Sequence, residues 1–371
     1  MEKENKRIES ALPKQVKEVL GKLSEYGYSA YLHGECVRVL IKGQTHLDEV
    51  KAFDFDLFTN ATMPRIRAIF ENYQVNEENL ERGELIVTIL GVAVSITCYT
   101  DLESELKNEH AFTFDAIAYT PVKGVLDLFG GLSDLEKGEL NFIETGKNFN
   151  PHDILPALAW QSSGEFNISD LAKEAILNEN NIIEMAKPSY VKESQDAKNL
   201  KAILTERNVA TVLSEYSKVF IAIIPELKKL YSPVLDNIAA HTFKCVGSSA
   251  PILTLRYALL FHELGKEDCR AVNANGEESF YGHAERARIY AKRIMSRLGC
   301  PVEDIEETEY IIENAQKASC ADEENIADLK DEFPPHLLKL LLLFNCAICR
   351  GAETPDEKSA GKFKKLSKGL R

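Results

Sequence analysis

The 371-residue sequence has no hydrophobic run long enough to cross a membrane. Its longest apolar segment, residues 336–348, is shorter than the roughly 20 residues that a membrane helix needs, and it contains Lys339. The first ten residues, MEKENKRIES, contain no apolar stretch after their charges, so we expect no secretory signal. We therefore expect a cytoplasmic protein with no membrane partner.

Paired cysteine motifs are also missing. The eight cysteines are scattered through mostly apolar segments, which favours reduced, buried thiols over a disulfide framework. Cys346 and Cys349 have C-x-x-C spacing, but no second pair accompanies them. We interpret them as residues of a core helix rather than as a metal or redox site.

An excess of positive charge is the third absence, because the formal net charge is −14. Nucleic-acid binding depends on contacts between basic side chains and phosphates, so this balance disfavours a nucleic-acid partner. It does not exclude one, since an acidic protein can still carry a local basic surface.

The patterns that are present fall into two kinds. The first 150 residues mix helical and strand-like periodicity, whereas the rest of the chain has almost only helical periodicity broken by prolines. The segments predicted as helices are 12–27, 35–43 and 63–73, and those predicted as strands are 28–34, 52–60, 84–100 (a hairpin), 112–119 and 125–129. The expected fold class is α+β, with a small mixed-sheet head followed by an all-α body.

The segment FDFDLFTN, residues 53–60, places two aspartates one residue apart within a strand. Alternate residues of a strand share a face, so the carboxylates of Asp54 and Asp56 should lie about 6–7 Å apart on one side. That spacing suits joint binding of Mg²⁺, which prefers carboxylate oxygens and keeps positions open for phosphates. An edge strand with one polar face is an equally good interpretation of the pair alone.

The ordered series of motifs around this strand resembles one enzyme family. HGECVRV (33–39) is similar to the first glycine motif of the class II polymerase-beta-like nucleotidyltransferases, which include the CCA-adding tRNA nucleotidyltransferases and the bacterial poly(A) polymerases. The segments that resemble later motifs are FDFDLFTNA, FTFDAIAY (112–119), VLDLFGGLSDL (125–135), the neck DILPALAWQSSGEFNI (153–168) and RYALLFHELGK (256–266) of an HD-type helical domain.

The resemblance implies a domain order and an activity. It implies a nucleotidyltransferase head at 1–147, a helical neck and body at 148–225, and an HD-like helical domain with a C-terminal tail at 226–371. The implied activity is template-independent, Mg²⁺-dependent transfer of nucleotides from NTPs to an RNA 3′ end, with tRNA as the expected substrate. Nothing in the sequence indicates an oligomeric state.

The resemblance also implies roles for five residues. Asp54 and Asp56 would bind Mg²⁺ and act in catalysis. Gly34 and Arg38 would steady the phosphates, and a glycine before a helix N-terminus is suited to that task. Asp153 would contact the base.

Several positions depart from the family pattern. Residues that replace family glycine, asparagine or charged positions in the head are Glu35, Val39, Ser95, Thr100, Glu109, His110, Ala111 and Asp115. In the neck, Pro156 and Ala159 replace two arginines of the family pattern, which pairs with the base edge of CTP or ATP. A catalytically inactive RNA-binding or regulatory homologue is therefore the alternative hypothesis.

A third hypothesis is a metal-dependent phosphohydrolase of the HD type. His241, His262, Glu263 and His283 stand near the positions of its metal ligands. Glu263 stands where this family has an aspartate, and asparagines stand near the position of its last metal ligand. A purely structural helical domain is therefore the competing interpretation.

Overall fold

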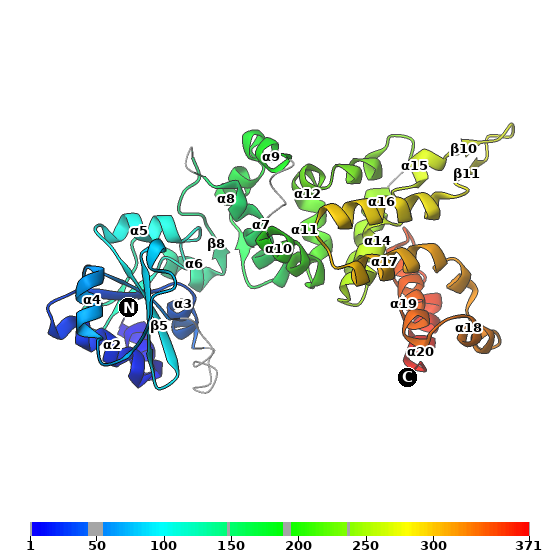
Figure 1. Cartoon of the computed structure of the whole chain (residues 1–371). Helices are drawn as coiled ribbons and strands as arrows, with labels where there is room; N and C mark the ends of the chain where they lie inside the picture. The colour runs from blue at the N-terminus through cyan, green and yellow to red at the C-terminus, as the bar shows by residue number, and fades with distance from the viewer. Residues whose placement is uncertain (1, 44–54, 147–148, 188–193, 236–237, 371) are drawn as a thin grey trace. The chain divides into compact units, whose positions relative to one another are not determined.

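The chain folds as two compact units. The computed structural model describes residues 2–43, 55–146, 149–187, 194–235 and 238–370. The first unit comprises Met1–Phe149 and Ile168–Ala172, and the second comprises Asn150–Asn167 and Lys173–Arg371. The first contains the large sheet, and the second is mainly helical (Figure 1). The predicted α+β class is confirmed, and the predicted boundary at 225/226 stays a prediction.

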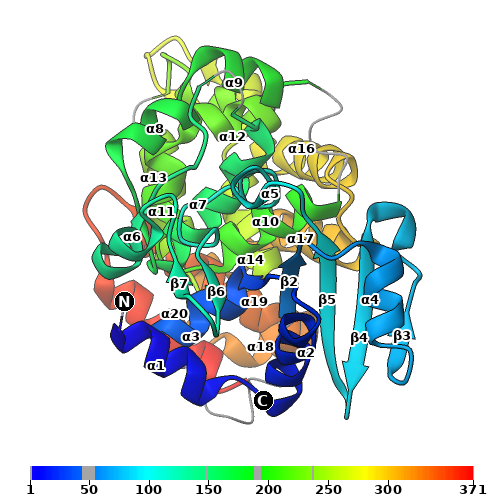
Figure 2. The same cartoon turned by 90° about the vertical axis from the view of Figure 1, so that its left-hand side faces the viewer.

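A seven-stranded mixed sheet forms the centre of the first unit, in the order β3-β4-β5-β2-β1-β6-β7. Its strands are β1 (Ala30–His33), β2 (Phe55–Thr59), β3 (Gln74–Asn76), β4 (Glu84–Ile89), β5 (Val92–Cys98), β6 (Ala118–Thr120) and β7 (Gly124–Leu126). β2 is the central strand, parallel to β5 and antiparallel to β1. Figure 2 shows β2, β5 and β4 side by side. The helices of this unit are α1 (Glu2–Ala11), α2 (Lys14–Glu25), α3 (Glu35–Lys42), α4 (Met63–Ile69), α5 (Leu102–Glu109) and α6 (Gly131–Lys137).

The two faces of β2 enter different hydrophobic clusters. Phe55 and Leu57 pack in the large core with apolar residues of α1 to α4. Phe58 packs on the other face with Tyr31 and Leu106. The predicted alternation is therefore confirmed for the described part of the strand, because its residues change face one by one.

Two of the strand predictions have different outcomes. The hairpin over 84–100 is confirmed, since β4 and β5 pair around Leu90 and Gly91, both with positive φ. The strand predicted over 112–119 is wrong for most of its length, because only its last two residues belong to β6. Residues 112–117 turn instead, and the N–H of Ala116 donates to the Phe112 carbonyl. The alternating apolar pattern there reflects a buried turn rather than a pleated strand.

The rest of the chain is mainly helical. Its elements are β8 (Glu139–Leu140), α7 (Ile154–Ser163), β9 (Asn167–Ile168), α8 (Asp170–Ile176), α9 (Glu179–Met185), α10 (Ser194–Thr205), α11 (Val209–Glu215), α12 (Ser217–Ile223), α13 (Ile238–Ser248), α14 (Leu253–Phe261), α15 (Lys266–Cys269), β10 (Ala271–Val272), β11 (Glu278–Ser279), α16 (His283–Arg297), α17 (Val302–Asn314), α18 (Ile326–Glu332), α19 (Pro335–Gly351) and α20 (Glu357–Lys368), with short 3₁₀ turns between some of them. Within the described ranges, no helix is both long and apolar enough to span a membrane. All eight cysteines are free, and Cys346 and Cys349 lie in α19 as predicted.

Candidate functional site

Asp56 lies on the central strand β2 and faces away from the large helical core. Its cross-strand neighbours are His33 on β1 and Ser95 on β5. Residues directly opposite each other on neighbouring strands share a face, so these three side chains project from the same side of the sheet. A half-buried carboxylate at this place is a suitable oxygen ligand for a hard cation. Asp54 lies outside the described residues, so the predicted metal pair stays a prediction.

The turn between β1 and α3 brings Gly34 next to two buried histidines. Gly34 has a φ of +77°, which favours glycine, and a Cβ there would lie 3.3 Å from His110 Cε1. His110 Nε2 lies 2.9 Å from His33 Nδ1, and the His33 ring stacks on Phe58. Burial and the neighbouring His110 hold the pKa of His33 well below its ordinary value, and burial lowers the pKa of His110 to about 4. Both rings are therefore neutral at pH 7, and one donates its hydrogen bond to the other.

Arg38, which the resemblance assigns to the phosphates, is buried and held by two carboxylates. Its Nε donates to Asp115 Oδ1 at 2.8 Å, and a terminal N–H donates to Glu35 Oε1 at 3.2 Å. Its side chain is only 5% exposed, and the guanidinium lies over the Phe114 ring. The N–H of Gly34 donates to the backbone carbonyl of Asp115 at 3.0 Å. Asp115 thus engages both groups that were predicted to steady the phosphates.

Burial and the positive charge of Arg38 act in opposite directions on the ionisation of Asp115. Burial raises the pKa of this carboxyl above its ordinary value, and the positive charge of Arg38 works against that rise. The pair is therefore a desolvated ion pair, whose charge is not available to a ligand without rearrangement.

The glycine pair of LDLFGG has a structural role next to this site. The Asp127 carboxylate accepts hydrogen bonds from the N–H groups of Gly131 and Leu132 at 2.9 and 3.0 Å, which caps α6. A Cβ on Gly131 would lie 2.2 Å from the carbonyl oxygen of Thr113. Close packing at this glycine therefore supports the turn that carries Asp115.

In the second unit, Asp153 immediately precedes α7. Burial raises the pKa of its carboxyl to about 6, although the neighbouring His152 opposes the rise. Pro156 and Ala159, at the positions of the family arginines, line a cavity of about 410 Å³. The other described residues that line it are Trp160, Ser163, Glu165 and Asn199. Among these lining residues there is no lysine or arginine, so no described cation replaces the lost arginines on this wall.

Three of the four residues predicted for a second site come together, also in the second unit. His241 of α13 and the adjacent pair His262 and Glu263 place their ligand atoms within 4.8 Å of one another. The Nδ1 atoms of the two histidines lie 3.0 and 2.7 Å from the carbonyls of Gly351 and Leu259, so each Nδ1–H donates to backbone. The two Nε2 atoms then face Glu263 Oε1 at 3.8 and 3.1 Å. Two imidazole nitrogens and a carboxylate form a donor set that suits a divalent transition metal.

The surroundings complete only part of a metal site. Lys266 Nζ lies 2.7 Å from Glu263 Oε2. Burial acts to raise the pKa of the Glu263 carboxyl, but His262 and Lys266 outweigh it and hold that pKa well below its usual range. His283 begins α16 with its Nδ1 2.8 Å from the Phe280 carbonyl, and it is not part of the cluster. The Asn345 side chain donates to backbone carbonyls within the helical core. In the described part of the chain the cluster thus offers three protein ligands.

Sequence reasoning found some of these groups only indirectly. His110, Asp115 and Glu35 were noted as replacements, without a role, and His33 was not singled out. One signal was available, because an aspartate replaces an asparagine while its distant partner, Arg38, is kept. When an acidic residue appears at one position of a motif and an arginine is kept at another, an ion pair between them, such as that of Asp115 and Arg38, is one explanation.

No protein-family model matches the chain. Among curated proteins, the chain is 28% identical to the CCA-adding enzyme of Leuconostoc mesenteroides over 181 residues, which cover 43% of each protein. It is 35% identical to the CCA-adding enzyme of Limosilactobacillus reuteri over 136 residues, which cover 32% of each. The matches thus span less than half the length of these relatives.

Solved structures show the same fold over nearly the whole chain. The CCA-adding enzyme of Bacillus stearothermophilus in complex with CTP matches 96% of this chain and 82% of its own, with 16% identity and a TM-score of 0.59. The CCA-adding enzyme of Thermotoga maritima complexed with tRNA matches 98% of this chain and 85% of its own, with 15% identity and a TM-score of 0.60. These matches confirm the resemblance found in the motifs: the chain is a diverged relative of the bacterial class II CCA-adding enzymes.

Proposed function

We propose that this protein is a template-independent RNA 3′-end nucleotidyltransferase that uses NTPs and a tRNA-like substrate. The observation that supports it most is the position of Asp56 on the central strand, beside the β1–α3 turn, in a chain with the fold of CCA-adding enzymes. The curated relatives bear the name CCA-adding enzyme, and solved relatives were obtained with CTP and with tRNA.

The proposed chemistry assigns separate tasks to the two units. Transfer joins the 3′ oxygen of the RNA to the α-phosphorus of the NTP and releases pyrophosphate. Asp54 and Asp56 would hold Mg²⁺, which would supply charge neutralisation at the triphosphate and activation of the 3′-hydroxyl. The α3 N-terminus after Gly34 would orient phosphate oxygens through its N–H groups. The RNA would be held mostly through its shape and backbone.

Base recognition would differ from the family pattern. Asp153 is kept, but the neck cavity presents Trp160 in place of arginine contacts. An aromatic ring stacks on any base, with an energy of about 1–3 kcal/mol per base. We therefore expect weak discrimination between CTP and ATP, because stacking does not read the hydrogen-bonding edge of the base.

The transfer reaction is tested with Mg²⁺, labelled NTPs and tRNA that lacks its 3′ end. We expect nucleotide addition that falls by about 100-fold or more in Asp56→Asn, since a catalytic metal contributes several kcal/mol. Asp101→Asn, the same chemical change at the exposed cap of α5, should retain activity. Addition that is absent in the parent protein, or unchanged in Asp56→Asn, would contradict the proposal.

Trp160 supplies a direct readout for the neck cavity, because it is the only tryptophan of the chain. Titration with CTP or ATP should quench its fluorescence to a similar extent for both nucleotides. A response to one nucleotide alone would contradict stacking as the mode of recognition, and no response would place the base elsewhere.

The catalytically silent alternative is favoured by one observation, the neutralisation of Arg38 by Asp115 and Glu35. A silent homologue would bind tRNA with an affinity that falls as salt rises, as expected for phosphate contacts. It would show no transfer with any NTP. The same preparation therefore distinguishes the two functions.

The phosphohydrolase alternative is favoured by the convergence of His241, His262 and Glu263. It predicts bound Zn²⁺, Mn²⁺ or another divalent transition metal in the purified protein, detected by mass spectrometry. It also predicts metal-dependent phosphate release that is lost in His262→Ala. Metal content below one-tenth of an equivalent, or release that survives this substitution, would remove this alternative.

A further inference from the structure

Glu84, the first residue of β4, lies on the same face of the sheet as Asp56. Ser95 of β5 is directly opposite Asp56 on one side and Ile86 on the other, so these three residues share a face. Glu84 comes two residues before Ile86 and therefore projects from that face too. Its carboxylate accepts a hydrogen bond of 2.5 Å from the Ser95 hydroxyl. The fold thus places a carboxylate over β5, the strand next to that of Asp56.

The direction of the Glu84 side chain is set by two neutral donors. Thr97, not Ser95, is the residue directly opposite Glu84, so the carboxylate turns diagonally to reach Ser95, which is level with Asp56. Its other oxygen accepts from Asn79 Nδ2 at 2.8 Å, at the start of the short turn before β4. Neutral donors of this kind orient a carboxylate without cancelling its charge.

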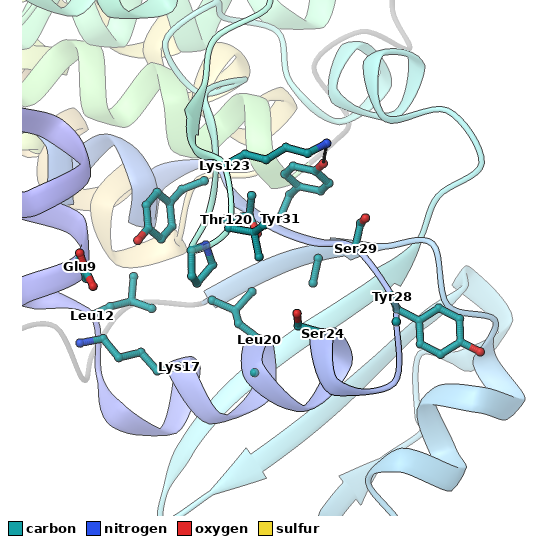
Figure 3. A pocket seen from close by; sticks show the side chains of 16 residues that line it. Glu9, Leu12, Lys17, Leu20, Ser24, Tyr28, Ser29, Tyr31, Thr120 and Lys123 are labelled. Carbon is teal, nitrogen blue, oxygen red and sulfur yellow. Dashed lines mark hydrogen bonds between the residues drawn. The ribbon is translucent and has the colours of Figure 1, made fainter. Parts of the chain in front are cut away.

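No cation in the described ranges pairs with Glu84, whose contacts there are those neutral donors. Arg38 is held by Asp115 and Glu35. Lys123, towards the other end of β1, donates to the Tyr31 hydroxyl at 3.3 Å (Figure 3). Carboxylates gathered on one small area repel each other, and a divalent cation removes that repulsion.

We propose that Glu84 is a further acidic residue of the metal site of Asp56, contributed by β4 and oriented by Ser95. The inference rests on the proposed function in one respect, that Asp56 binds a divalent cation. Mg²⁺ prefers carboxylate oxygens and keeps several water ligands. A carboxylate one strand away, where strands are about 4.8 Å apart, binds such a cation through its water ligands. Ser95 is a positioning residue that acts through Glu84.

The test measures metal binding to the full chain, with Mn²⁺ as the probe. Mn²⁺ has ligand preferences like those of Mg²⁺, and electron paramagnetic resonance counts its free form. The site compared is the Mn²⁺ site that is lost in Asp56→Asn. Glu84→Gln should weaken that site by about tenfold, since a unit negative charge beside a divalent cation is lost. Glu81→Gln, the same change at an exposed glutamate three positions earlier, should alter it by less than about twofold.

Ser95 variants test the orientation of Glu84. Ser95→Ala removes the hydroxyl but no charge and should weaken the Mn²⁺ site by about threefold, whereas Ser95→Thr keeps the hydroxyl and should retain the parent affinity. The double variant Ser95→Ala/Glu84→Gln should bind Mn²⁺ as Glu84→Gln does, because Ser95 acts through Glu84. Losses that multiply in the double variant would contradict this role of Ser95.

Nucleotide transfer, measured on the same proteins, separates this inference from the proposed function. Parent affinity for Mn²⁺ in a folded Glu84→Gln protein would overturn the role of Glu84, even where transfer is observed. Weaker Mn²⁺ binding in Glu84→Gln, with no transfer by the parent, would support that role and contradict the proposed function. A parent chain without a Mn²⁺ site that depends on Asp56 would overturn the inference. Thermal unfolding verifies the fold of each variant, and Ser95→Ala decides the matter if Glu84→Gln is unfolded.

Discussion

Asp115→Asn should increase the affinity of the head for triphosphate. In the present chain the Asp115 carboxylate binds Arg38 Nε at 2.8 Å and adds a negative charge where phosphates are expected. Asparagine has the same shape and keeps an oxygen that accepts from Arg38, so the substitution removes the charge and retains the hydrogen bond. The charge of Arg38 is then balanced by Glu35 and no longer by residue 115, so its attraction for an anion increases.

The magnitude follows from Coulomb's law. A phosphate oxygen that contacts the far edge of Arg38 would lie about 7 Å from the Asp115 carboxylate, and two unit charges at that distance interact by about 2.4 kcal/mol at an effective dielectric constant of about 20. The Asp115 side chain is 19% exposed, so water weakens the repulsion, and about half of it is a reasonable expectation. A gain of about 1.2 kcal/mol for each unit of phosphate charge corresponds to about eightfold in affinity.

The assay is calorimetric titration with Mg²⁺ and tripolyphosphate, or with Mg²⁺ and CTP, which needs no catalysis. Glu35→Gln should give a smaller gain than Asp115→Asn, because the Glu35 side chain is 65% exposed and solvent screens its charge. Thermal unfolding of both variants verifies the fold. Unchanged or weaker triphosphate binding in a folded Asp115→Asn protein would refute the electrostatic reasoning.

Two further predictions concern stability. The folded-state pKa of Asp153 is raised to about 6, so the folded protein binds this proton more tightly than the unfolded chain, and the contribution of Asp153 to stability should fall as pH rises from about 4 to 6. Urea unfolding of parent and Asp153→Asn should therefore show the variant gaining relative stability between pH 4 and pH 7, and a constant difference would contradict the raised pKa. Gly131→Ala should destabilise the fold by about 3 kcal/mol, since its Cβ would lie 2.2 Å from the Thr113 carbonyl oxygen. Gly361→Ala is the matched control, and a similar loss in both variants would contradict the steric argument.

Local patterns predicted the parts of the head whose structure depends on neighbouring residues. The helix over 35–43 ends at Gly43, which has a φ of +66°, and glycine is the residue that adopts this conformation most readily. The alternation of β2 and the hairpin of β4 and β5 could also be predicted from the sequence, because a period of two and a short turn are local properties. The 112–117 turn could not be predicted, since its apolar residues are buried on all sides and their spacing resembles that of a strand.

The amino-acid sequence by itself determined the α+β class, the order of the motifs and the identity of the retained acids. Only the tertiary structure decided what those residues contact. Arg38 and Asp115 are 77 positions apart, as are His33 and His110, and each pair meets because β1, α3 and the turn before β6 converge at one end of the strand. Such contacts depend on strand order and register, which no local period encodes. The sequence therefore predicted a motif for phosphate binding, whereas in the fold its arginine is buried against Asp115.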